Sequence, residues 1–368
     1  MTPNPPFGVL LHSVGGLAAA SFYIPYKGVR GWAWENFWLI GGAFSWIIAP
    51  WAIAMLIVPQ TPQVLAETSA KTLWWTFFFG VMWGVGGLTF GLTMRYLGIA
   101  LGYAIALGLC AAFGTLIPPI FKGEFDTIAS SPGGQITLLG CALCLVGIAI
   151  SGVAGVGKER ELTDEQNRET VSEFSLWKGL AVAVLCGIMS AAMAFGIEAG
   201  APMTEIAKTR GVNPIWAGLP VLIVVMAGGF LTNAVWCVIL QAKNKTLTAY
   251  TRGDAHGAPP VALNLLLCAA AGVIWYFQFF FYTMGASQMG RFGFSSWTLH
   301  MASIIVFSTL WGIALKEWRG TSLRTHAIIA AGLIVLIGSM VVVGWGTKRS
   351  ADDALEPVPV GDAMMERS

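Results

Sequence analysis

The feature that most limits the fold of this chain is a series of long apolar stretches. A helix needs roughly 20 apolar residues to cross a hydrocarbon core about 30 Å thick, and such stretches recur along the 368 residues between short charged or Pro/Gly breaks. Hydrophobic residues make up 56% of the sequence and charged residues only 11%, and the mean hydropathy is +0.69. A water-soluble fold could not bury so much apolar surface, so the sequence predicts an all-α polytopic membrane protein.

Ten apolar windows are expected to be transmembrane helices. They lie near residues 7–26, 36–58, 73–94, 97–120, 134–156, 178–199, 213–240, 261–285, 293–315 and 323–345. The longest polar connection separates five spans from five, and an odd number of spans in each half gives the halves opposite orientations. Two inverted five-helix repeats are therefore predicted. The expected divisions are a first repeat over 1–157, a polar linker over 158–177, a second repeat over 178–346 and a polar C-terminal tail over 347–368.

The distribution of charge predicts an orientation and excludes one class of partner. Of the 21 Lys and Arg residues, 13 fall in the loops after odd-numbered spans and 8 on the other side. The positive-inside rule then places the odd loops in the cytoplasm and both termini outside. The formal net charge is only +2, and no basic tract alternates with aromatic residues, so nucleic acid is not an expected partner. Membrane lipid is an expected partner, and the oligomeric state is left open.

Several chemistries are disfavoured by what the sequence lacks. The six cysteines all fall in apolar stretches, and the one CxxC pair, Cys141 and Cys144, has no histidine nearby, so packing is favoured over a metal or redox role. There is no phosphate-binding G-x-x-x-x-G-K-[ST] loop and no H-E-x-x-H or G-x-S-x-G motif. We therefore expect no metal, no cofactor and no enzymatic activity, and energy supplied by an ion gradient or by the solute's own gradient.

The eighth predicted span has a polar and aromatic stripe. Asn264, Ala271, Trp275, Gln278 and Tyr282 recur at spacings of seven, four, three and four, which places them on one helical face. Amide, indole and phenol groups together suit a sugar, whose hydroxyls need hydrogen-bond partners while its C–H face stacks on an aromatic ring. The alternative is that the same side chains only pack against neighbouring helices.

Three ionisable residues inside predicted spans are candidates for proton coupling. His12 shares a face with Tyr23 in the first span, and His300 lies beside Trp297 in the ninth. Imidazole has an ordinary pKa of about 6.5 and exchanges protons near neutral pH. The alternative for each histidine is a neutral ring in a helix-helix hydrogen bond. Glu198 is the one acidic residue inside a predicted span, and an interfacial position in contact with water is its favoured interpretation.

Several strings of the sequence resemble those of a known transporter family. They are His12, FY at 22–23, Pro25, WE at 34–35, MWG at 82–84, GLTMRYLG at 91–98, WYFQFFFY at 275–282, SW at 296–297, LHM at 299–301 and LKEW at 315–318. They are similar to strings of the bacterial L-rhamnose/proton symporter family, which belongs to the drug/metabolite transporter superfamily. The resemblance runs from about residue 7 to 345.

The resemblance implies ten helices in two inverted repeats and proton-coupled uptake of a deoxyhexose by alternating access across the bacterial inner membrane. It implies H+ as the coupling ion and no cofactor, whereas the residues by themselves leave H+ and Na+ both open. The family pattern has more polar residues where this chain has Gly87, Thr89 and Phe292 to Phe294, and an amide where it has Glu198, so the exact sugar is left open. The superfamily is often drawn with both termini in the cytoplasm, contrary to the charge count, and we retain the charge count.

Residue roles follow from the stripe and the resemblance together. The expected substrate-binding residues are Trp83, Trp275, Gln278, Tyr282, Trp297, His300, Tyr23 and Asn264. The expected proton-coupling residues are His300, His12 and Glu198. An exporter of the same superfamily is the main alternative function, and a membrane-bound enzyme or a sensor is a weaker one.

Overall fold

A computed structural model describes residues 3–97, 99–161, 176–250, 261–316 and 318–353, and this part of the chain contains helices and no strand. The helices, in chain order, are α1 (Pro5–Ser21), α2 (Tyr23–Tyr26), α3 (Trp34–Ala43), the π-helical segment η1 (Phe44–Ile48), α4 (Ala49–Ile57), α5 (Thr61–Glu67), α6 (Ala70–Leu97), α7 (Ile99–Phe121), α8 (Phe125–Ser130), α9 (Pro132–Glu161), α11 (Leu176–Ala199), α12 (Ala201–Thr209), α13 (Leu219–Asn244), η2 (Leu247–Tyr250), α14 (Val261–Gln288), η3 (Gly290–Ser295), α15 (Ser296–Ala314) and α16 (Leu323–Asp353).

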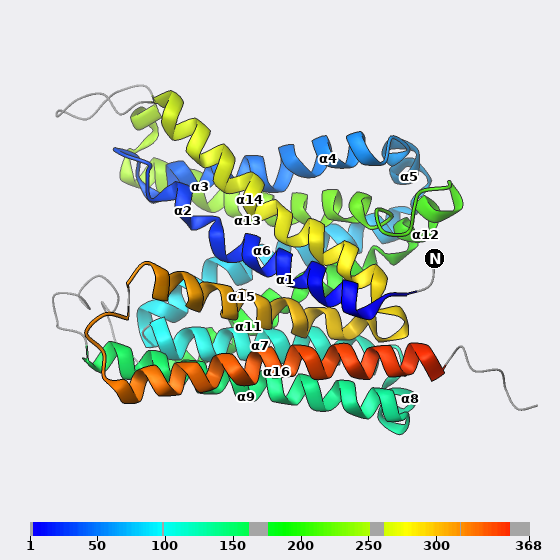
Figure 1. Cartoon of the computed structure of the whole chain (residues 1–368). Coiled ribbons are helices and arrows are strands. Elements are labelled where there is room, and N and C mark those ends of the chain that lie inside the picture. Colours follow the sequence, from blue (N-terminus) through cyan, green and yellow to red (C-terminus); the bar gives the residue numbers. More distant parts are fainter. Residues whose placement is uncertain (1–2, 98, 162–175, 251–260, 317, 354–368) are drawn as a thin grey trace, which may run out of the picture.

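The long helices account for the predicted crossings. Within the described residues, nine segments are long and apolar enough to cross a membrane, and α7 contributes a shorter apolar stretch, Ile105–Phe121. The chain passes back and forth along one direction in Figure 1, so that α1 begins and α16 ends at the same end of the bundle. The predicted fold class, an all-α polytopic membrane protein, is confirmed.

Two predicted boundaries differ clearly from the structure. The seventh span begins at Leu219 instead of 213, because Asn213 accepts a hydrogen bond from the Ile215 backbone N–H in a tight turn before the helix. The last helix runs to Asp353, so the polar tail does not begin at 347. The extension is explained by packing on α9, because Gly346 and the buried Ser350 lie directly against Gly133 of that helix.

Both ends of the predicted linker, residues 158–177, are helical. Helix α9 continues to Glu161 and α11 begins at Leu176, so both helices extend into the range 158–177. The remaining linker residues, 162–175, and the tail from 354 onward lie outside the described residues. The division into a first and a second repeat therefore stays a prediction at its exact boundaries.

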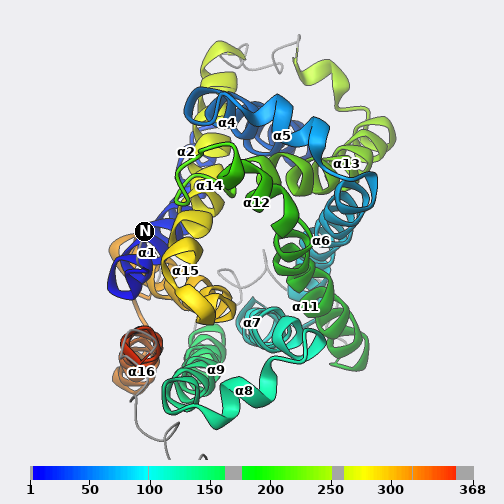
Figure 2. The same cartoon turned by 90° about the vertical axis from the view of Figure 1, so that its right-hand side faces the viewer.

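The packing of the helices repeats between the two halves. Helix α6 of the first half packs against α11 and α13 of the second half, and α7 of the first half packs against α11. The equivalent helices five spans later do the same: α14 packs against α1 and α3, and α15 packs against α1. Helices α9 and α16 are also equivalent, and they pack against each other at the lower end of Figure 2. Since α1 and α11 run in opposite directions in Figure 1, this is the arrangement that inverted repeats produce.

Glycines allow the closest helix crossings. A Cβ atom added at Gly80 of α6 would overlap the Val225 carbonyl oxygen of α13, and one added at Gly272 of α14 would overlap the Gly41 carbonyl oxygen of α3. Small residues permit such close backbone approach, which drives helix association inside a membrane. The two crossings are equivalent under the exchange of halves.

We expect Gly80→Ala to lower the thermal stability of the purified protein clearly. The added methyl group meets a backbone carbonyl that cannot rotate away, and overpacking of this kind costs about 1–3 kcal/mol. Gly87→Ala is the matched control on the same helix, because a Cβ there meets nothing within 4 Å. Thermal unfolding in detergent should separate the two variants, and equal midpoints would show that the α6–α13 crossing is not tight.

Candidate functional site

Three tryptophans from different helices meet at the middle of the bundle. The ring centre of Trp275 on α14 lies 5.4 Å from that of Trp46 and 5.6 Å from that of Trp83 on α6. Trp46 and Trp83 are themselves 5.9 Å apart. The sequence prediction that Trp83 and Trp275 share a site is consistent with this contact, and the structure adds Trp46, which the sequence analysis did not single out.

Trp46 reaches the site because the second span is not a regular α-helix. The π-helical segment Phe44–Ile48 lies between α3 and α4 near the middle of that span. Single π-helical turns inside α-helices are rare and occur frequently at functional sites. Apolar periodicity does not reveal such a turn, which is why Ser45 and Trp46 were missed.

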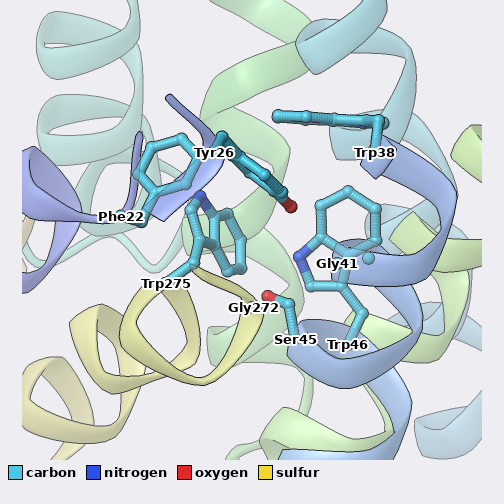
Figure 3. Close-up of a pocket in the computed structure, with 9 residues that line it drawn as sticks. Phe22, Tyr26, Trp38, Gly41, Ser45, Trp46, Gly272 and Trp275 are labelled. Atoms are coloured by element: carbon cyan, nitrogen blue, oxygen red, sulfur yellow. The ribbon is translucent and has the colours of Figure 1, made fainter. Parts of the chain in front are cut away.

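The π-helical segment forms one wall of a pocket. Its lining residues are Phe22, Tyr26, Trp38, Gly41, Gly42, Ser45, Trp46, Gly272 and Trp275. Figure 3 shows aromatic rings around the space, with the Ser45 hydroxyl at one side. The pocket as it stands has room for about one water molecule, so a larger solute requires the helices to separate.

A second cluster lies next to the tryptophans, around Tyr282 of α14. Its ring centre is 5.3 Å from that of His12 on α1, 5.3 Å from that of His300 on α15 and 5.7 Å from that of Trp297. Phe279 joins the clusters, since its ring lies 5.4 Å from Trp275 and 5.7 Å from His300. Residues that the sequence placed on three separate helices thus meet in one place.

Five buried nitrogen atoms on α1, α14 and α15 lack hydrogen-bond partners. Both ring nitrogens of His12 and of His300 are buried without a hydrogen bond, and so is the side-chain nitrogen of Gln278. Both histidines are fully buried. Buried polar groups in native proteins nearly always have a partner, so each such atom here indicates a place for water, a proton or a ligand.

Trp297 differs from the two histidines, because its polar atom already has a partner. Its indole N–H donates to the Cys110 carbonyl oxygen of α7 at 3.0 Å, and the side chain is buried. The ring is therefore held against α7 and can offer a solute its face but not its N–H group.

Two predicted substrate-binding residues lie away from the unpartnered groups. The Asn264 amide accepts from the Arg30 N–H at 3.1 Å and donates to the Arg30 carbonyl at 2.7 Å. Both ends of this amide are occupied in holding the connection between the first two spans. Tyr23 is 47% exposed and packs on Phe22 and Trp38, behind the pocket wall.

Glu198 lies at the end of a span and not in the cluster. Its carboxylate forms an ion pair with Lys122, and both side chains are 43% exposed. This contact favours the interfacial interpretation of Glu198 over a role in the proton path. Lys122 follows directly on α7, so the pair joins the ends of two neighbouring spans.

The structure also contains a buried carboxylate that sequence reasoning placed outside the spans. Glu35 of α3 is only 4% exposed and accepts hydrogen bonds from Asn244 at 3.1 Å and from Thr246 at 2.8 Å. Its neighbour Asn36 accepts from Gln241 at 3.1 Å. These contacts tie the start of α3 to the end of α13. The position of Glu35 in the first turn of an apolar helix was the sequence feature that could have indicated this buried carboxylate.

No metal site accompanies these groups in the part of the chain that the structure describes. There, no three His, Cys, Asp or Glu side chains come close enough together to hold a metal ion. Cys141 and Cys144 are buried and unbridged between packed helices.

Known proteins match the chain over nearly its whole length. The family model of the L-rhamnose-proton symport protein (RhaT) matches residues 1–349. The L-rhamnose-proton symporter of Yersinia pestis (strain Pestoides F) is 40% identical over 341 residues, which cover 92% of this chain and 97% of that protein. The protein of the same name from Shigella flexneri is 41% identical over the same extent. The family consists of transporters and not of enzymes, and this chain belongs to the L-rhamnose-proton symporter family.

Proposed function

We propose that this protein carries L-rhamnose, or a closely related small sugar, into the cell together with a proton by alternating access. Besides family membership, the observation that carries the proposal is the pairing of the two clusters. An aromatic pocket around Trp46 and Trp275 lies beside two buried imidazoles that lack hydrogen-bond partners. We place this symport in the inner membrane of a bacterium, where a proton gradient is available.

The aromatic pocket suits the sugar. The indole face of Trp275 offers a surface for the C–H face of a pyranose, and its neighbours Trp46 and Trp83 hold it in position. Gln278, one helical turn further along α14, has a free amide N–H group for a ring hydroxyl. A neutral ligand is favoured, since none of the residues that line the pocket is charged.

The histidine pair suits the proton. His12 and His300 contact the same tyrosine ring, Tyr282, and each lies deep between helices. Two positive charges this close together in a medium of low dielectric constant repel strongly, so the pair accepts one proton at a time. Phe279 contacts both Trp275 and His300. A movement of Trp275 when sugar binds can therefore be transmitted through Phe279 to the histidine pair.

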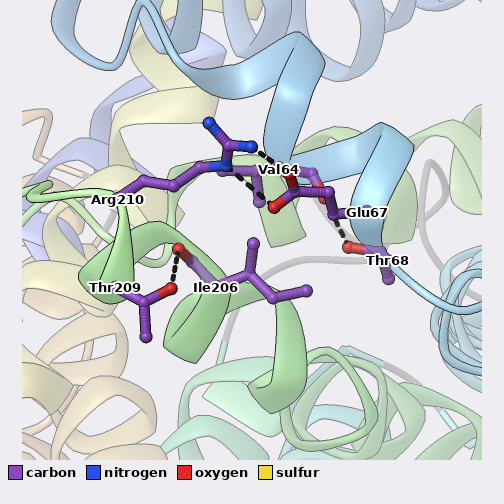
Figure 4. A network of polar contacts seen from close by, with 6 residues as sticks. All are labelled: Val64, Glu67, Thr68, Ile206, Thr209 and Arg210. Atoms are coloured by element: carbon purple, nitrogen blue, oxygen red, sulfur yellow. Dashed lines mark hydrogen bonds and ion pairs between the residues drawn. The ribbon is translucent and has the colours of Figure 1, made fainter.

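Two polar contacts at opposite ends of the bundle support alternating access. The α5–α12 latch is the ion pair between Glu67 of α5 and Arg210, which follows α12 (Figure 4). The α3–α13 latch consists of Glu35 and Asn36 with Asn244 and Thr246. Both are closed in this structure and the pocket is small. We infer that transport opens one latch at a time.

The α5–α12 latch should affect the rate of transport and leave its pH dependence unchanged. Hydrogen bonds from Arg210 hold the pKa of Glu67 below its usual range. The lowered pKa means that the ion pair is complete at every pH above the ordinary value of about 4.5 and is lost only as pH falls through the lowered value. Glu67→Gln should therefore change the uptake rate by about two- to fivefold with the same pH profile between about pH 5.5 and 8.

Lys208→Gln is the control for that variant. Lys208 pairs with Glu205 of its own helix, so the substitution removes a surface ion pair without touching a contact between helices. Its uptake should equal that of the unaltered protein. A shifted pH profile in Glu67→Gln would mean that Glu67 itself titrates during transport, contrary to the latch.

The proposed function is tested by uptake of radiolabelled L-rhamnose into proteoliposomes, with and without an inward proton gradient. We expect accumulation above the external concentration only with the gradient. Competition by unlabelled sugars ranks the substrates. Efflux of apolar dyes without competition by any sugar would instead identify an exporter and overturn the proposal.

A further inference from the structure

Two buried polar atoms in the aromatic pocket have no hydrogen-bond partner. They are the hydroxyl of Ser45 and the indole N–H of Trp46, both in the π-helical segment Phe44–Ile48. Ser45 is 3% exposed and Trp46 is 5% exposed, so neither atom is satisfied by bulk solvent. Both residues line the pocket (Figure 3). A buried donor without a partner costs free energy, which a bound ligand can restore.

Two serines elsewhere in the spans show how a helix usually satisfies a serine hydroxyl. Ser13 donates to the Val9 carbonyl at 2.9 Å, and Ser151 donates to the Gly147 carbonyl at 2.8 Å. This bond to the carbonyl four residues earlier is the ordinary way for a serine to satisfy its hydroxyl inside an apolar helix. Ser45 makes no such bond, and of the three serines whose buried hydroxyls lack a partner in the described residues, Ser45, Ser296 and Ser350, it is the one that lines the pocket.

The opposite wall of the pocket is an aromatic ring, against which a ligand bound to these two atoms can lie. The Trp275 ring stands nearly perpendicular to Trp46, with an interplanar angle of 82° and ring centres 5.4 Å apart. Gly41, Gly42 and Gly272 also line the pocket, where the backbones of α3 and α14 are in direct contact, so a sugar enters only when these two helices separate. The pocket thus presents a hydroxyl and an N–H donor on one side and an aromatic ring on the other.

We propose that Ser45 and Trp46 of the second span bind the hydroxyl groups of the sugar and determine which sugars are accepted. This inference rests on the proposed function and assigns to it a recognition element outside the stripe on α14. The Ser45 hydroxyl can either donate to or accept from one ring hydroxyl, and the Trp46 N–H donates to a neighbouring oxygen. A site that hydrogen-bonds a hydroxyl rejects the analogue that lacks it, because the buried partner is then left unsatisfied.

The test is equilibrium binding of radiolabelled L-rhamnose to the purified full-length protein without a proton gradient. Ser45→Ala should weaken binding about tenfold, the loss expected for one hydrogen bond to a buried partner. Trp46→Phe, which keeps a ring and removes only the N–H group, should weaken it by a similar factor. Ser151→Ala and Trp236→Phe are the controls, since Ser151 donates within its own helix and Trp236 is 44% exposed on the outer surface.

Deoxy analogues of L-rhamnose identify the hydroxyl that Ser45 holds. The unaltered protein should bind one of the monodeoxy sugars about tenfold more weakly than L-rhamnose, and Ser45→Ala should bind that sugar and L-rhamnose equally well. If the unaltered protein binds L-rhamnose and both variants bind it as tightly with unchanged selectivity, the assignment of Ser45 and Trp46 is wrong and the proposed function stands. If the unaltered protein binds no sugar, the proposed function fails and the assignment fails with it.

Discussion

His300→Gln is expected to abolish accumulation driven by a proton gradient while sugar exchange at equal pH continues. With one proton carried per sugar, a gradient of about two pH units can concentrate the solute about 100-fold, because each unit is worth about 1.4 kcal/mol. Without a residue that binds the proton, the ratio of internal to external sugar should fall to about one. Glutamine keeps the polarity and much of the volume of His300, which is fully buried against Phe279 and Tyr282.

The paired histidine provides a further check. His12→Gln should produce the same loss, and the double variant should be no worse than either single one, because residues that act as a unit are not additive. His326→Gln is the matched control and should behave as the unaltered protein, since His326 is exposed in the first turn of α16. Full accumulation by His300→Gln would remove His300 from the proton path.

Trp275→Ala is expected to weaken L-rhamnose binding by about 30- to 100-fold. The variant removes the ring on which the sugar stacks and leaves Trp46 and Trp83, which lie 5.4 and 5.6 Å from it, without their common neighbour. Trp275→Phe keeps an aromatic face and should lose less than tenfold. Equilibrium binding measures both variants, and Trp236→Ala on the exposed surface is the control.

Loss of folding must be separated from loss of binding for Trp275→Ala. Truncating a large core side chain can cost about 3–5 kcal/mol of stability, so thermal unfolding of each purified variant should be measured as well. A variant that unfolds near the temperature of the unaltered protein and still binds the sugar normally would show that the ring is packing material and not part of the sugar site.

Sequence reasoning predicted the spans well because a single physical requirement dominates them. Each crossing needs enough apolar residues to match the bilayer, and long stretches such as 261–285 are visible without knowledge of any neighbour. The errors lie at helix ends. Asn213 moved one boundary through a local hydrogen bond, and the packing of Gly346 and Ser350 on α9 moved the other; hydropathy records neither.

The stripe on α14 was predictable for a similar reason. Trp275, Gln278 and Tyr282 share a face by helical spacing alone, and the structure places Trp275 in the tryptophan cluster and Tyr282 in the histidine cluster, with Phe279 between them. Asn264 shares the same spacing, yet its amide is occupied by the Arg30 backbone. Spacing determines which face a residue occupies, but not which part of the neighbouring chain meets it there.

By itself, the sequence determined that the chain is a bundle of membrane-spanning helices in two opposed halves, since span length and the odd number of spans per half depend only on local apolarity. Only the tertiary structure decided that His12 and His300 meet at Tyr282 and that a π-helical turn turns Ser45 and Trp46 toward the pocket. These features depend on which helices become neighbours and on a local departure from the α-helical register. Neither is visible in the apolar periodicity of one segment, because the first depends on contacts between segments far apart in the chain and the second changes the helical register without changing the hydropathy.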